Sequence, residues 1–188
     1  MKLVIGITGA SGAIYGLRLL ERLRPHADVE VHLILTRSGE KTLFLENGKT
    51  AAEVRSLAHF SYPVEDVSSR LASGSATIDA MVIAPCSIHT MSAIANGISS
   101  NLLVRAADVM LKEKRRLVLM IRETPLHLGH LRNMTALAEM GAVIAPPIPG
   151  FYHHPKTVLD VVDHSLDRVL DLLTIPDSQV RRWDGAAR

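Results

Sequence analysis

Hydrophobic runs of strand length alternate with segments of helical periodicity along most of the chain. Lys2–Thr8 and Val29–Thr36 are rich in Val, Ile and Leu and are bounded by turn residues, which is typical of buried strands. Between them, the apolar residues of Ala13–Arg24 recur at the spacing of one helix face. Together these segments predict a strand, helix, strand unit.

The same alternation continues to Leu173. Three more strands are expected, at 78–87, 115–125 and 142–147. Helices are expected at 37–48, 50–60, 88–97, 101–114, 128–141 and 156–173. Strands separated by helices predict one parallel sheet with right-handed crossovers and helices on both faces. The expected fold class is therefore α/β, a three-layer Rossmann-like or flavodoxin-like sheet in a single domain.

The length and composition of the chain indicate how many hydrophobic cores it can form and which kinds of partner it can bind. At 188 residues, of which 47% are hydrophobic, the chain is long enough for one core and buries roughly 70% of its unfolded surface. The formal net charge of +2 does not support a nucleic-acid or membrane footprint. No stretch approaches the ~20 apolar residues of a membrane span. The single cysteine, Cys86, excludes an internal disulfide and favours a cytoplasmic location.

The residues that follow each predicted strand are small and polar. They are "TGASG" at 8–12, Thr36–Gly39, "PCSIHT" at 85–90 and "RETPLH" at 122–127. Ligands bind beyond the carboxyl ends of the strands in open parallel sheets. Hydroxyl groups, backbone N–H groups at helix starts and an arginine there predict an anionic, phosphate-bearing ligand.

The glycine-rich turn does not match two familiar phosphate-binding motifs. Gly6, Gly9 and Gly12 lie three residues apart, which is not the dinucleotide spacing, and no Gly-Lys-Ser/Thr follows as in a Walker loop. NAD and nucleoside triphosphates are therefore disfavoured. A tight turn with Ser11 as a helix N-cap remains an alternative interpretation.

The other candidate groups have structural interpretations. A lone cysteine at a buried strand end is more often an apolar filler than a nucleophile, so Cys86 is taken as structural. The histidines, among them His127, His130, His153 and His154, lack neighbouring acidic or cysteine ligands, and we expect surface or capping roles rather than a metal site.

Five stretches in one order carry a specific resemblance. They are "GITGASGAIYGLRLL", "APCSIHT", "LLVRAADVMLKEKRRLVLMIRETPLHLGHLRNM", "PPIPGFYHHP" and "RVLDLL". In these the chain resembles the UbiX family of flavin prenyltransferases, including the small subunit associated with phenolic-acid decarboxylases. The resemblance runs from Lys2 to Trp183.

The resemblance implies an enzyme that condenses reduced FMN with dimethylallyl phosphate. Bonds form at flavin N5 and C6, and the product, prenylated FMN, serves a partner decarboxylase of the UbiD type; no metal is needed. It also implies a homododecamer whose active sites lie where subunits meet. Residues 1–188 would form one flavoprotein domain, with 174–188 a tail that packs on a neighbouring subunit.

The resemblance further implies roles for individual residues. Ser11 would lie near flavin N5 and work with Glu123 in proton transfer, while Tyr152 and Arg168 would hold the dimethylallyl phosphate and Lys112 would contact its phosphate. The residues expected to bind FMN are Gly9, Ala10, Ser11, Thr36, Ser87, Ile88, His89, Thr90 and Arg122. Further substrate-site positions are Arg105, Glu46 and Trp183.

These residue types suit the chemistry. A departing phosphate needs charge-assisted donors, which Lys112, Arg122 and Arg168 would supply, and an allyl cation needs a π face such as the flavin or Trp183. His89 stands where many relatives carry lysine, and the loop around Glu46 is only loosely similar to theirs. The chain does not reveal whether the donor is a mono- or diphosphate, or whether the product feeds ubiquinone synthesis or phenolic-acid decarboxylation.

Three alternatives stay open at this stage. A flavin-dependent cysteine decarboxylase shares the expected fold but would give Tyr152 and Arg168 no phosphate to hold. A non-catalytic flavin carrier of an aromatic-acid decarboxylase would leave Glu123 dispensable. A direct decarboxylase would need a group that activates an aromatic acid, and none is evident.

Overall fold

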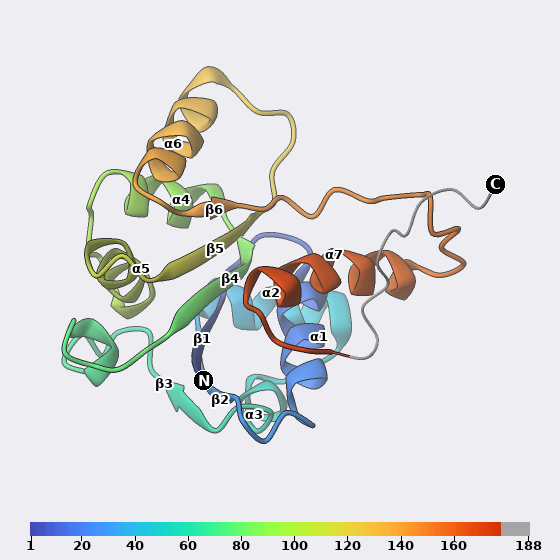
Figure 1. Cartoon of the computed structure of the whole chain (residues 1–188), viewed down its shortest axis with the longest axis horizontal. Helices are drawn as coiled ribbons and strands as arrows, with labels where there is room; N and C mark the ends of the chain where they lie inside the picture. The colour runs from blue at the N-terminus through green and yellow to red at the C-terminus, as the bar shows by residue number, and fades with distance from the viewer. Residues whose placement is uncertain (178–188) are drawn as a thin grey trace. The chain divides into compact units, whose positions relative to one another are not determined.

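Six parallel strands form one sheet within residues 1–146 (Figure 1). The computed structural model describes residues 1–177 and divides the chain into two compact units, 1–146 and 147–188. The strand order is β3-β2-β1-β4-β5-β6, and every neighbouring pair is parallel. The strands are β1 Lys2–Ile7, β2 Glu30–Leu35, β3 Phe60–Tyr62, β4 Ala80–Cys86, β5 Arg116–Ile121 and β6 Val143–Ile144. The predicted α/β fold class is confirmed.

Helices alternate with these strands, as the periodicity predicts. The first unit contains α1 Ala13–Leu23, α2 Arg37–Asn47, α3 Ala51–Arg55, the short 3-10 turn η1 Arg70–Ala72, α4 Ile88–Ala95, α5 Leu102–Lys112 and α6 Leu128–Glu139. The second unit contains α7 Val158–Leu172, whose start is closed by a capping box between Thr157 and Asp160. No helix of residues 1–177 is long and apolar enough to cross a membrane.

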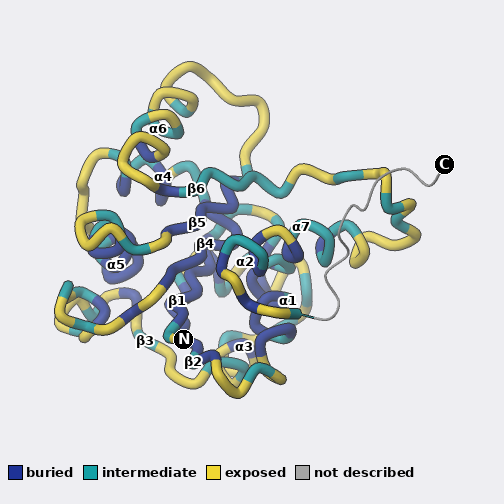
Figure 2. The backbone as a smooth tube through the Cα atoms, viewed as in Figure 1, coloured by how far each residue is buried: buried dark blue, intermediate teal, exposed yellow. Residues whose placement is uncertain are grey.

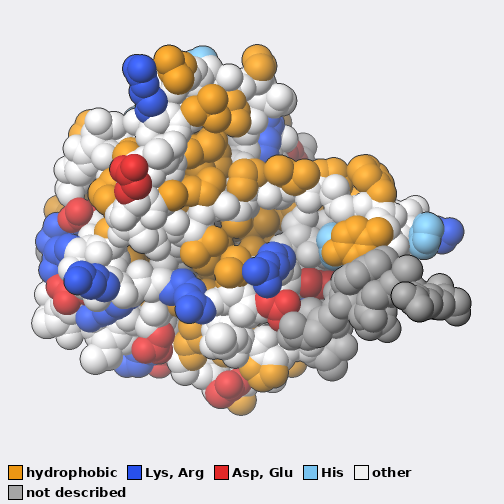
Figure 3. All heavy atoms as spheres, turned by 45° about the horizontal axis from the view of Figure 1, so that its top comes forward, with side chains coloured by type: hydrophobic (Ala, Val, Ile, Leu, Met, Phe, Trp, Pro, Cys, Tyr) orange, Lys and Arg blue, Asp and Glu red, His pale blue; other side chains and the backbone are white. Residues whose placement is uncertain are grey.

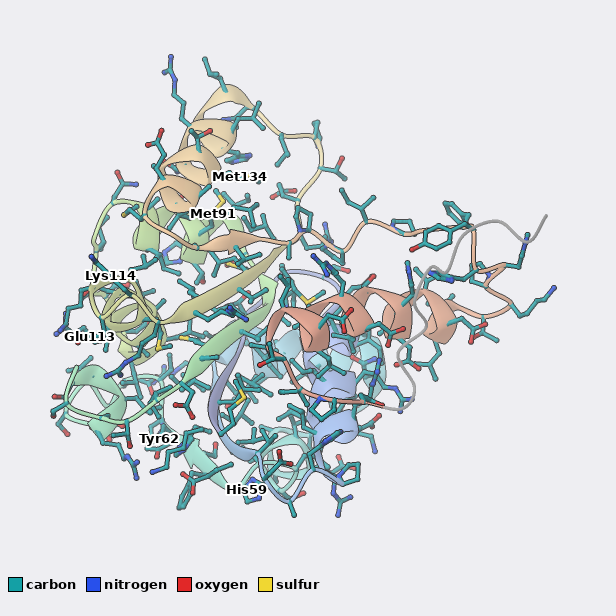
Figure 4. All side chains as sticks on the ribbon, viewed as in Figure 1. His59, Tyr62, Met91, Glu113, Lys114 and Met134 are labelled. Carbon is teal, nitrogen blue, oxygen red and sulfur yellow. The ribbon has the colours of Figure 1, made fainter. Side chains whose placement is uncertain are left out.

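The helix expected over 50–60 is wrong in its second half. Helix α3 ends at Arg55, and Phe60–Tyr62 forms the edge strand β3, which pairs with His32–Ile34 of β2. Just before β3, the Nδ1 atom of His59 accepts the Val31 N–H at 3.0 Å, so the side chain of His59 joins the start of β3 to β2 (Figure 4). Aromatic residues fit the pleated edge of a sheet, and β2 offers backbone partners that a local helical pattern does not register.

The central strands are buried along almost their whole length (Figure 2). Helix α1 covers one face, and α5 covers the other with Leu103 and Ala107, both fully buried (Figure 1). Helix α1 packs unusually close to the sheet: a Cβ atom at Gly16 would lie 2.3 Å from the carbonyl oxygen of Ala84. Coverage of both faces explains why these strands are continuous hydrophobic runs rather than alternating ones.

The strand order reverses between β1 and β4, which is the topological switch point of the sheet. The chain adds β2 and β3 on one side of β1, then returns to add β4, β5 and β6 on the other. At this point the Thr8 hydroxyl donates to the Pro85 carbonyl at 2.6 Å and accepts the Ser87 N–H at 2.9 Å. One buried side chain thus joins the carboxyl ends of β1 and β4.

We predict that Thr8→Val destabilises the fold by about 1–3 kcal/mol, because the buried Ser87 N–H and Pro85 carbonyl lose a shared partner while side-chain volume is kept. Denaturant unfolding, compared with the wild type, measures the change. Thr8→Ser retains the hydroxyl and is the matched control. Equal stabilities of the Val and Ser variants would show that the hydroxyl contributes nothing.

Candidate active site

The glycine-rich turn leads into α1 through a left-handed residue, Gly12, with φ of 95°. Gly12 is the N-cap, and no side chain of the turn closes the helix. A carboxylate from α2 does so instead: Oε2 of Glu46 accepts the N–H groups of Gly12 at 2.9 Å and Ala13 at 3.0 Å. The interpretation of Ser11 as a helix cap is therefore wrong, and the positive end of α1 already holds an anion of the chain itself.

Ser11, Glu46 and Arg122 meet at this turn. The Ser11 hydroxyl hydrogen-bonds the Glu46 side chain, and Nε of Arg122 donates to the Ser11 carbonyl oxygen at 3.0 Å. Burial raises the pKa of Glu46, but the three hydrogen bonds from Ser11 and the helix start, together with the charge of Arg122, outweigh it. The pKa of the Glu46 side chain is therefore lower than that of an ordinary glutamate, and Glu46 is a carboxylate at neutral pH.

Glu123 lies beside Arg122 just beyond β5. The Arg122 N–H donates to the Cys86 carbonyl at 3.1 Å, which ties the end of β5 to the end of β4. Glu123 is exposed, and its Oε1 accepts the Thr124 N–H at 2.9 Å. The predicted acid therefore shares an edge of the sheet with Ser11, although the hydroxyl of Ser11 bonds to Glu46.

A cavity of about 670 Å³ opens at the same edge of the sheet. Its lining residues are Thr8, Gly9, Thr36, Arg37, Ser38, Val64, Glu65, Ser87, His89, Thr90 and Asn101. Five of these, Gly9, Thr36, Ser87, His89 and Thr90, are among the residues that the sequence assigns to FMN. The volume lies within the usual range of small-molecule sites.

Three helices begin at this cavity. Thr36 caps α2 by accepting the Gly39 N–H at 3.0 Å, and Ser87 caps α4 by accepting the Thr90 N–H at 3.3 Å. Asn101 caps α5 by accepting the Val104 N–H at 3.0 Å. The positive ends of three helix dipoles converge there, which favours a negatively charged group such as a phosphate.

The cavity also has charged residues that sequence reasoning did not select. Arg37 and Glu65 form an ion pair, with Nε and Oε1 2.7 Å apart, between α2 and the segment after β3. His89, which the family resemblance assigns to FMN, also lines the cavity, and its side chain is exposed. Arg37 follows a strand end that the sequence already marks as polar, but Glu65 lies beyond the unpredicted strand β3, and no local signal indicates it.

Two predicted residues lie on other parts of the first unit. Lys112 is in the last turn of α5, where it pairs with Glu113. Because α5 rises about 1.5 Å per residue, roughly 16 Å of helix separate it from the Asn101 cap. Arg105 donates to the Ala72 carbonyl at 3.1 Å and pairs with Asp108 at 2.6 Å. Neither Lys112 nor Arg105 lines the cavity.

The second unit holds Tyr152 and Arg168. The Tyr152 hydroxyl lies 3.2 Å from Nε2 of His164, and its side chain is half exposed. Arg168 lines a separate depression of about 400 Å³ with Asp171 and residues 174–176. Trp183 lies outside the described residues.

Cys86 and His127 have the structural roles that the sequence favours. Cys86 is fully buried, and burial raises the pKa of its thiol to about 12, so it is not a thiolate at neutral pH. His127 caps α6 by accepting the Gly129 N–H at 3.0 Å. Among residues 1–177, no group of three or more His, Cys, Asp or Glu side chains is placed to hold a metal ion.

Known proteins resemble this chain over nearly its full length. Residues 1–170 match the family described as Flavoprotein. Flavin prenyltransferase UbiX of Escherichia coli (strain K12) is 50% identical over 187 residues, which cover 98% of this chain and 99% of that protein.

Solved structures agree. A dodecameric FMN-dependent UbiX-like decarboxylase from Escherichia coli O157:H7 superimposes with a TM-score of 0.97 at 45% identity, over 98% of this chain and 100% of that one. AnUbiX (PadA1), solved with FMN and dimethylallyl pyrophosphate, gives a TM-score of 0.96 at 41% identity, over 99% and 98%. The FMN-dependent cysteine decarboxylase TvaF, at 22% identity and a TM-score of 0.59 over 88% and 97%, shares the fold alone. The chain belongs to the UbiX family of flavin prenyltransferases.

Proposed function

We propose that this protein transfers a dimethylallyl group from dimethylallyl phosphate to reduced FMN. The C–O bond of the donor breaks and inorganic phosphate leaves as a carbon bond forms at flavin N5, which loses its proton. The C=C bond of the attached group then takes up a proton at one carbon and bonds to flavin C6 through the other, and the C6 proton is lost to a base. The observation that carries the proposal is 50% identity to a flavin prenyltransferase over 98% of the chain, together with a cavity at the strand ends that suits a phosphate-bearing ligand.

We assign the two ends of FMN to different parts of the edge. The FMN phosphate would take the cavity where α2, α4 and α5 begin, held by Thr36, Ser87 and Thr90. The FMN phosphate would not bind at the N-terminus of α1, because the Glu46 carboxylate already accepts the N–H groups of Gly12 and Ala13 there. The turn at Gly9, Ala10 and Ser11 is left for the flavin ring.

Proton transfer is assigned to Ser11 and the acids near it. With Glu46 ionised, the Ser11 hydroxyl donates to it, so the serine oxygen is oriented and can accept a proton or hydrogen bond from N5. Glu123 is exposed beside Arg122 and is assigned as the base that removes the C6 proton. Arg122 would place its positive charge near the departing phosphate.

The donor phosphate is assigned to Tyr152, Arg168 and Lys112, with Arg105 and Trp183 at the same site. Lys112 is about a helix length from the cavity of its own chain, so a second copy must supply it. The UbiX-like structure from Escherichia coli O157:H7 is dodecameric. Exposed Leu128 and Leu131 on α6 give this chain an apolar surface for such an assembly (Figure 3).

Three finer assignments belong to the same proposal. The product would pass to a UbiD-type decarboxylase, the assembly would be a dodecamer whose tails at 174–188 reach neighbouring subunits, and the enzyme would work in the cytoplasm. The decarboxylase partner and the packing of the tails follow from the family resemblance, and residues 178–188 of the tail lie outside the described residues. The dodecamer follows from the solved relative, and the cytoplasmic location from the single buried cysteine.

We predict that the purified protein adds one five-carbon prenyl unit to FMN when reduced FMN and dimethylallyl phosphate are supplied under anoxia. Mass spectrometry of the extracted flavin measures the gain. A parallel reaction with dimethylallyl pyrophosphate, the ligand found in AnUbiX, identifies the preferred donor. An unchanged flavin mass with both donors would refute the proposed function.

Glu123→Gln should bind FMN normally but stall after the first bond, because the base for the C6 proton is lost. We expect the finished product to form at least about 100-fold more slowly, the size typical of a lost general base. Rapid-quench sampling with mass and absorbance detection separates the singly bonded adduct from the product. Glu139→Gln, an exposed change on α6, is the control. Product formation at the normal rate would remove Glu123 from this role.

A further inference from the structure

Two histidines of the second unit surround the hydroxyl of Tyr152. His164 of α7 places Nε2 3.2 Å from the Tyr152 hydroxyl oxygen, and the same nitrogen hydrogen-bonds Nε2 of His153. The ring centroids of Tyr152 and His153, and those of His153 and His164, are 3.9 Å apart in each pair. All three residues belong to one compact unit, so the cluster is a local feature of the loop before α7 and of that helix.

The loop is packed tightly onto these rings. A Cβ atom at Gly150 would lie 2.8 Å from Cε1 of His164 and 3.1 Å from Cε1 of Tyr152, so the backbone approaches both rings closely. His153 and His164 are half-buried, whereas Tyr152 is 50% exposed. The two histidines are therefore less exposed than the tyrosine, half of whose side chain faces solvent.

The chemistry of the imidazole ring restricts what this cluster can do. A ring nitrogen carries either one N–H or one lone pair, so His164 Nε2 is a donor to its two partners or an acceptor from one of them. As a donor, it points its N–H at the Tyr152 oxygen and the His153 lone pair. The Tyr152 proton is then directed toward another acceptor. As an acceptor from Tyr152, His164 Nε2 would instead engage the hydroxyl proton itself.

We propose that His164 is a positioning residue that holds Tyr152 as a hydrogen-bond donor to the phosphate of the prenyl donor, with His153 fixing the protonated nitrogen of His164. The inference rests on the proposed function, because that function places a phosphate at Tyr152. A phosphate oxygen accepts the Tyr152 proton, and the N–H of His164 polarises the tyrosine oxygen from behind. Loss of His164 should weaken phosphate binding without touching FMN.

The test compares two replacements of His164 in the full-length protein. His164→Leu removes the N–H, whereas His164→Gln keeps an amide N–H at a similar reach; both suit a helix. We expect the leucine variant to raise KM for dimethylallyl phosphate about 5- to 10-fold, the value of one hydrogen bond, with kcat less affected. The inhibition constant of inorganic phosphate should rise by the same factor, and the glutamine variant should restore both to within about threefold.

A double variant separates positioning from packing. In a Tyr152→Phe background, His164→Leu should add less than about twofold, because the hydroxyl it orients is absent. His154→Asn, at an exposed residue with φ of 52° that asparagine tolerates, is the matched control. His164→Asn, whose amide is too short to reach Tyr152, replaces the leucine variant if that one does not fold.

Three results would overturn the role of His164, and a different result would overturn the proposed function. Equal losses in the leucine and glutamine variants, an unchanged KM in the leucine variant, or an undiminished loss in the phenylalanine background would each overturn the role of His164. These results require an active wild type. A wild-type protein that forms no prenylated flavin would instead overturn the proposed function.

Discussion

The hydrogen bonds of the Thr8 hydroxyl hold together the two strands between which the sheet changes direction. The carboxyl ends of β1 and β4 must stay in register there, since the first turn leaves one strand and the start of α4 leaves the other. A crevice forms at such a point because the connections on its two sides run apart. The cavity, the glycine-rich turn and the Arg122 contact all lie around this junction, and the proposed flavin site depends on it.

The next constraint is electrostatic. Helix α1 begins at the glycine-rich turn, to which the proposed function assigns the flavin ring, and an open N-terminus there would attract the phosphate of FMN to that place. The Glu46 carboxylate satisfies that helix start and also binds the Ser11 hydroxyl. The starts of three other helices, α2, α4 and α5, face the cavity. In the proposed assignment, Glu46 thereby separates the phosphate end of the site from its reactive end, and it orients the Ser11 hydroxyl.

Much of this arrangement could be predicted from the sequence, and the exceptions have physical causes. Buried strands and amphipathic helices follow from local periodicity, and the polar strand ends mark the site. Strand β3 was missed because its pairing partner, not its own pattern, defines it. The hydrogen bond between the Ser11 hydroxyl and the Glu46 carboxylate joins residues 35 positions apart in the sequence, and no local pattern predicts it. The family resemblance supplied Glu46 and Lys112, and the helix predicted over 101–114 already put Lys112 near its end. Only the fold shows that the start of this helix, at Asn101, lines the cavity and that Lys112 does not.

Under the proposed function, the active site belongs to the assembly rather than to one chain. Glu123 follows β5 at the carboxyl ends of the strands, whereas Lys112 is in the last turn of α5, away from the cavity. A site that uses both residues, as proposed, would therefore take them from different copies. Chains carrying Glu123→Gln and chains carrying Lys112→Ala, each nearly inactive alone, can be co-expressed with different tags and purified through both. The account predicts that the mixed oligomers regain a substantial fraction of wild-type prenyltransfer. Mixed oligomers as inactive as either parent would contradict it.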